Sequence, residues 1–153
     1  MAASMTFNMR PPLKTVIKSL GLTAQEMKKI DDQTLDQFTA WGVREIQKSM
    51  TSSGQGQPGG EAWFPLSEDW IDWKDAIGWS NLIGVATGAM KQSTSGFANK
   101  SKKQSEIGVG GAASEYAEYF AYTKSGQDKR PVLPEDDYAV NKLQNLYFTK
   151  LGR

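Results

Sequence analysis

Four carboxylates within eight residues are the side chains of this chain best suited by type and spacing to chemistry. They are Glu68, Asp69, Asp72 and Asp75 in the stretch SEDWIDWKD. Paired carboxylates act as general acid and base when burial separates their pKa values, and they also bind hard cations. Here they alternate with tryptophans, which is typical of an amphipathic surface element whose acids face water. We therefore expect these residues to be neither catalytic nor metal-binding.

Composition excludes most other catalytic systems. The 153 residues contain no cysteine and no histidine, which removes Cys and Ser–His nucleophiles, thiolate or imidazole zinc sites, haem ligation and iron–sulfur clusters. The segment GVGGAA, residues 108–113, fits G-x-G-x-x-A, but only about forty residues follow it, too few for the parallel strands of a dinucleotide-binding fold. We expect no cofactor and no enzymatic activity.

Tryptophan is concentrated in one segment. Four of the five tryptophans, Trp63, Trp70, Trp73 and Trp79, lie within residues 61–79. Trp70 and Trp73 are three residues apart and would share one face of a helix. A glycan or nucleic-acid platform usually pairs aromatics with basic or amide groups, whereas acids interleave here. We predict a subunit or partner interface at Trp70, Trp73 and Asp72; a core position is an equal alternative for Trp63 and Trp79.

A run of lysines without any acid is the second charged feature. Lys91, Lys100, Lys102 and Lys103 lie in a stretch of small polar residues. A solvated hairpin tip is the simpler interpretation, but such a loop also contacts phosphates through charge alone, so Lys100, Lys102 and Lys103 are candidate DNA contacts. Residues 61–75 instead contain five acids and one lysine. This polarity would suit a head-to-tail contact between identical subunits.

A single domain, residues 1–153, must position these features. Hydrophobic residues make up 39% and charged residues 23%, within the range of folded globular proteins. The net charge of +1 attracts the whole protein neither to nucleic acid nor to an anionic membrane. There is no apolar segment of membrane-spanning or signal-peptide length, so the default expectation is the cytoplasm.

The expected elements follow from capping and periodicity. Residues 1–12 read as a tail, residues 13–21 as a short helix, and the capping-box sequence TAQE, residues 23–26, opens a long helix to about Ser49. Its apolar stripe contains Met27, Ile30, Leu35, Phe38, Trp41 and Ile46, so Trp41 is read as a core residue. The glycine-rich segment TSSGQGQPGG, residues 51–60, is expected to be a flexible loop or arm.

The second half of the chain favours strands and then a helix. Residues 82–101 and 103–111 read as two antiparallel strands around a turn, with Ile107 and Val109 alternating against polar neighbours. Residues 113–126 have helical leanings, and a closing helix with acids in its first turn would bury Tyr138, Leu143, Leu146 and Tyr147. The expected fold is α+β, an antiparallel β-sheet packed by an N-terminal long helix and a C-terminal helix, with a flexible Gly-rich loop.

Four sequence landmarks, from GGEAWFPLS through ATGAMKQST and SEIGVGGAASEYAEYFAY to RPVLPEDD, follow one another along the chain. Their order resembles that of the phage virion morphogenesis proteins, the Mu-like tail completion group. The landmarks lie between residues 59 and 137, and the similarity as a whole spans roughly residues 35–150. Within them, the family pattern would fall on Trp63, Pro65, Leu66 and Ser67, on Thr87, Gly88 and Met90, on Val109, Tyr116 and Ala117, and on Arg130, Pro131 and Leu133.

This resemblance implies a structural virion protein rather than an enzyme. It implies a homo-oligomeric ring, commonly sixfold, at the head–tail junction, needed for tail finishing and head–tail joining. The implied partners are further copies of the chain, the adjacent connector or stopper, and the tail terminator or tail tube proteins. Non-specific contact of Lys100, Lys102 and Lys103 with genomic DNA in the lumen is a separate hypothesis. A tail terminator of the same region and a small Trp-rich module that binds a glycan or peptide are the alternatives.

Overall fold

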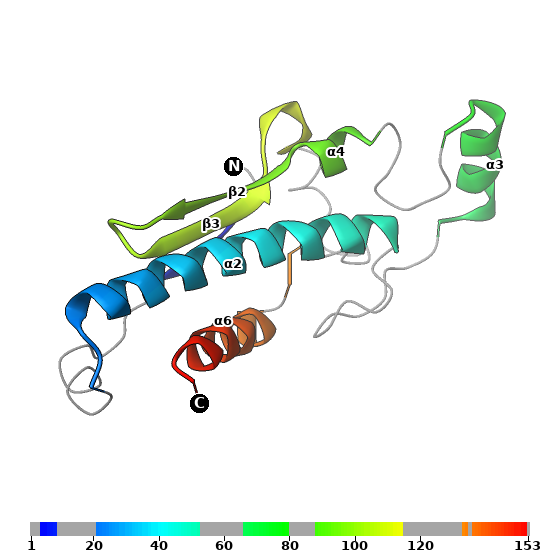
Figure 1. Cartoon of the computed structure of the whole chain (residues 1–153). Helices are drawn as coiled ribbons and strands as arrows, with labels where there is room; N and C mark the ends of the chain where they lie inside the picture. Colours follow the sequence, from blue (N-terminus) through cyan, green and yellow to red (C-terminus); the bar gives the residue numbers. More distant parts are fainter. Residues whose placement is uncertain are drawn as a thin grey trace.

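The computed structural model describes residues 4–8, 21–52, 66–79, 88–114, 133–134 and 136–152. These residues form an α+β fold (Figure 1). Strands β1 (Ser4–Asn8), β2 (Thr94–Asn99) and β3 (Gln104–Val109) make an antiparallel sheet in the order β1-β3-β2. The helices are α2 (Ala24–Thr51), α3 (Glu68–Ala76), α4 (Ala89–Gln92) and α6 (Asp136–Lys150), with a 3-10 turn, η1, at Gly111–Ala113. The expected fold class is confirmed.

Helix α2 begins at the predicted capping box. The Thr23 hydroxyl accepts a hydrogen bond from the Glu26 amide at 3.2 Å, and the Glu26 carboxylate accepts one from the Thr23 amide at 2.7 Å. That backbone hydrogen bond lowers the pKa of Glu26. The helix ends at Thr51, two residues beyond the expected end. It lies between the sheet and α6, so it packs on both sides (Figure 1).

The sheet meets α2 through alternating small and apolar residues. Ser105, Ile107 and Val109 of β3 are buried, as period-two alternation predicts. Glycines permit the close approach, because a Cβ on Gly96 would lie 2.6 Å from Thr39 Cγ2, and one on Gly42 would collide with Ile107. The approach also buries a hydroxyl pair, Thr39 and Ser105, 2.6 Å apart.

The opposite side of α2 is covered by α6. Trp41 is 7% exposed, and its ring centroid lies 5.3 Å from that of Phe38 and 5.6 Å from that of Tyr138. Ala139 is fully buried, while the predicted residues Tyr138, Leu143 and Leu146 pack against the same core. The prediction that Trp41 belongs to the core is therefore confirmed.

Two sequence interpretations require correction. Residues 1–12 are more than a tail, because Ser4–Asn8 pairs along β3 and Met5 packs against the core. The first predicted strand begins only at Thr94, because Ala89–Gln92 forms α4 after Gly88, whose φ is +79°. Three further predictions lie outside the described residues. They are the helix over residues 13–20, residues 53–60 of the glycine-rich segment, and the helical segment beyond residue 114; Trp63 also lies outside.

Within the described ranges, no helix has both the length and the apolar character needed to cross a membrane.

Candidate interface on helix α3

Helix α3 is short, and its ends are fixed by local chemistry. Glu68 and Asp69 in its first turn complement the positive end of the helix dipole. Gly78, with φ +71°, ends it in a Schellman motif: the Gly78 amide donates to the Asp75 carbonyl at 3.1 Å, and the Trp79 amide donates to the Lys74 carbonyl at 2.8 Å. This turn brings Trp79 back towards the helix.

The three tryptophans of this segment contact one another. The indoles of Trp70 and Trp73 are stacked, with centroids 4.6 Å apart and planes inclined by 17°. Trp79 meets Trp73 edge-on at 5.5 Å and 83°. Both arrangements are favourable for aromatic pairs. Trp70 and Trp73 therefore share one face of the helix, as predicted, and the turn at Gly78 brings a third indole, that of Trp79, against them.

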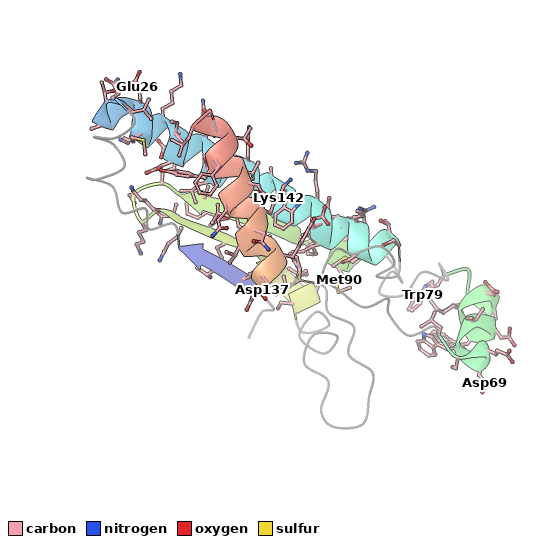
Figure 2. All side chains as sticks on the ribbon, turned by 90° about the horizontal axis from the view of Figure 1, so that it is seen from below. Glu26, Asp69, Trp79, Met90, Asp137 and Lys142 are labelled. Atoms are coloured by element: carbon pink, nitrogen blue, oxygen red, sulfur yellow. The ribbon has the colours of Figure 1, made fainter. Side chains whose placement is uncertain are left out.

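This aromatic cluster remains open to solvent. Trp70 is 47% exposed, Trp73 44%, Ile77 43% and Trp79 38%. We call these four residues the tryptophan face. The segment stands apart from the sheet, α2 and α6 in Figure 1, and Figure 2 shows Asp69 and Trp79 at different ends of it. An exposed apolar cluster of this kind is typical of an interaction site.

The four acids of α3 are all exposed, and three of them lie away from the tryptophan face. A helical projection at 100° per residue places Glu68, Asp72 and Asp75 on the side opposite the apolar residues, and Asp69 beside Trp73. Among the described residues, no group of three or more acidic side chains is placed to hold a metal ion. Asp72, predicted as part of the interface, thus lies on the acidic side of α3 rather than within the tryptophan face.

Lys74 is the one buried residue of α3, at 3% exposure. Burial lowers the pKa of its ammonium group, because a cation loses hydration there. Sequence reasoning did not single out Lys74. The available signal was its spacing, four residues after Trp70, which places it at the edge of the apolar face.

The three candidate DNA-contacting lysines occupy the turn between β2 and β3, but two of them bind carboxylates of α2. Lys100 Nζ lies 2.9 Å from Asp36 Oδ2, and this bond raises the pKa of Lys100. Lys103 Nζ lies 2.7 Å from Asp31 Oδ2. Lys102 is exposed and forms no ion pair with a described residue, although its amide donates to Asn99 Oδ1 at 3.1 Å.

The two ion pairs differ sharply in burial. Asp36 and Lys100 have side chains 52% and 47% exposed, whereas the Asp31 side chain is 3% exposed. Asp31 Oδ1 and the Tyr147 hydroxyl form no hydrogen bond of good geometry in the described part of the chain. Burial, together with the nearby Asp31 carboxylate, raises the pKa of Tyr147 to about 12. The sequence analysis missed this cluster, although Asp31 lies on the Met27–Leu35 face.

The turn between β2 and β3 and helix α3 lie at opposite ends of the molecule (Figure 1), so the structure does not bring the two predicted sites together.

No family model, curated protein or solved structure matches the chain.

Proposed function

We propose that this chain is a non-enzymatic structural protein of a tailed bacteriophage that forms a homo-oligomeric ring at the head–tail junction. The observation that carries the interface is the stacked, nearly half-exposed pair Trp70 and Trp73 on a helix that stands apart. Tryptophan is among the residue types enriched at energetically dominant interface positions. The phage assignment is supported by the order of the four sequence landmarks.

In this proposal the ring, commonly sixfold, belongs to the virion neck and is assembled in the host cytoplasm. Its neighbours are the connector or stopper on the head side and the tail terminator or tail tube proteins on the other. The turn with Lys100, Lys102 and Lys103 faces the lumen and contacts DNA through charge alone. Lys102 has the main role there, because the other two lysines are paired with acids.

The interface is tested by replacing Trp70 and Trp73 with Ala together. Because both side chains lie outside the core, the variant should fold with an unchanged far-UV spectrum but should no longer assemble in native mass spectrometry. The matched control is Phe97→Ala, which removes an aromatic that is 64% exposed on the sheet. Assembly that survives the double tryptophan change would remove the anchor assignment.

The role in the particle is tested by electron microscopy of lysates from the parent phage with this gene disrupted. Filled heads lying apart from tails are expected for a protein that joins heads to tails. Tails of normal length would favour completion, and tails of abnormal length would favour a terminator. Normal infectious particles would overturn the virion assignment altogether.

A small glycan- or peptide-binding module is the second candidate. The observation that favours it is the contiguous array of three exposed indoles, which offers both a ring face and a ring edge. Titration of the protein with oligosaccharides or peptides, followed by tryptophan fluorescence, tests this function. A saturable change that is lost in the Trp70→Ala, Trp73→Ala variant would favour the module over the ring.

A further inference from the structure

A second surface of the chain has the shape and chemistry to receive the tryptophan face. A groove of about 420 Å³ lies between α2 and β2, open to solvent and mostly apolar. Its volume is within the range of roughly 300–1,000 Å³ found for sites that hold small organic ligands. The lining residues are Asp36, Thr39, Ala40, Val43, Arg44, Gly96 and Ala98.

The groove exists because small residues line it. Gly96 lets β2 approach Thr39 and Val43 of α2 more closely than any other residue type would. The side chains of Ala40 and Ala98 are single methyl groups, so they leave the space between helix and strand unfilled. The result is an apolar trough, with a cationic side chain, Arg44, at one side.

Two charged residues line the groove, and one of them, Asp36, is paired with Lys100, which leaves Arg44 to meet an acid of the docking surface. Arg44 is exposed and forms no ion pair with a described residue. On α3, Asp69 is exposed and precedes Trp73 by one helical turn. A guanidinium also binds the face of an indole favourably, so Arg44 suits both the aromatic and the acidic parts of α3.

We propose that the tryptophan face of one copy docks into the α2–β2 groove of a second copy. This contact rests on the proposed ring and specifies how its subunits meet. Because the two surfaces are different patches of the same chain, the contact is head-to-tail, and it closes into a ring when the rotation between subunits permits.

The exposed area indicates that a single such contact is weak. With exposures of 38–47%, the three indoles offer on the order of 200–300 Å² for burial. A stable interface buries about 800 Å² on each partner. Pairs of subunits should therefore dissociate readily, while a closed ring, in which every subunit is held twice, should persist.

Covalent trapping suits a weak contact, and the absence of native cysteine makes it unambiguous. Ile77→Cys lies in the tryptophan face and Ala40→Cys lies in the groove, and both positions are exposed. Each variant is prepared separately, and the two are then mixed under mild oxidation. The expected product is a disulfide-linked dimer that contains one copy of each variant. Ser95→Cys, on the other face of the sheet, replaces Ala40→Cys as the matched control and should give little dimer.

A charge reversal checks the register of the same contact. Arg44→Glu in the Ala40→Cys chain should lower the yield of the mixed dimer about tenfold, because the docked contact places this position near Asp69 of α3. Asp69→Arg in the Ile77→Cys chain should restore it. Circular dichroism of each variant verifies that the fold is retained.

The outcomes separate this contact from the ring itself. If the unmodified chain assembles in native mass spectrometry but the mixed disulfide does not form, the docking is overturned and the ring stands. If a chain carrying both cysteines closes only an internal disulfide, α3 folds onto its own chain and the second-copy docking is overturned. If neither assembly nor a mixed disulfide is found, both proposals are overturned.

Discussion

Lys103 and Lys100 provide an internally controlled test of what a buried ion pair contributes to this fold. Both lysines belong to the turn between β2 and β3, and each reaches an aspartate of α2 at similar distance, 2.7 Å and 2.9 Å. The main difference between the two ion pairs is burial. Replacing either lysine with Met keeps the length of the side chain and removes its charge.

The expected magnitudes differ because the aspartates differ. Lys103→Met leaves Asp31, 3% exposed, as a buried carboxylate whose Oδ1 already lacks a hydrogen bond in the described structure. Removing one partner of a buried pair costs about 3–5 kcal/mol. Since the Lys103 side chain is 34% exposed, solvent screening favours the lower end, about 3 kcal/mol. Lys100→Met breaks a pair exposed on both sides and should cost less than about 1 kcal/mol.

Urea unfolding followed by far-UV circular dichroism measures both free energies at one protein concentration. In thermal unfolding, a loss of about 3 kcal/mol corresponds to roughly 6–12 °C for a chain of this length. Adding Asp31→Asn to Lys103→Met should recover part of the loss, because no charge is then buried. Equal destabilisation by the two single lysine changes would refute the reasoning from burial.

Three further predictions concern other contacts. Thr39 Oγ1 donates to the Leu35 carbonyl at 2.7 Å, so the Ser105 hydroxyl must donate to Thr39. Thr39→Val leaves the buried Ser105 hydroxyl without this acceptor and should lower the free energy of unfolding in urea by about 1–3 kcal/mol, more than Ser105→Ala does. Gly78→Ala should strain the left-handed turn by about 1–2 kcal/mol and weaken the near-UV dichroism of the indoles. Because α3 stands apart from the sheet, α2 and α6, local distortion of α3 should relieve this strain, so the melting temperature should change little. An unaltered near-UV spectrum would contradict this prediction. Burial raises the pKa of Tyr147 to about 12, above its ordinary value of 10.0. The stability that the neutral phenol contributes is therefore present below pH 10 and should be lost as the pH rises towards 12, with a slope of at most about 1.4 kcal/mol per pH unit. Tyr147→Phe should lack this slope, and an identical slope would exclude Tyr147 as its source.

The long helix and the central strand were predictable because their signals are local. Thr23 and Glu26 interact across three residues, and the alternation of Ile107 and Val109 requires only that one side of β3 be buried. The shared helical face of Trp70 and Trp73 follows equally from their spacing, although the stacking of their rings was not predicted. Such features depend on neighbouring residues, so a single sequence is sufficient to predict them.

Features formed by distant segments escaped sequence analysis. Strand β1 has five residues and little apolar content, and it becomes a strand because β3 offers an edge with which to pair. The pairing of Lys103 with Asp31 joins residues 72 positions apart, and no spacing rule reaches that far. The groove between α2 and β2 likewise depends on Gly96 meeting Thr39, a contact that neither sequence segment indicates alone.

The ion pairs of the turn also limit how this protein would respond to salt if it meets DNA. Each phosphate that a protein neutralises adds a slope of about −0.9 to the dependence of log affinity on log salt concentration. Three free lysines would give a slope of about −2.7, whereas Lys102 alone gives about −0.9. With Lys100 and Lys103 already bound to Asp36 and Asp31, the turn would hold DNA loosely and with little sensitivity to ionic strength. Such a surface would allow DNA to move along it and would not hold the DNA in place.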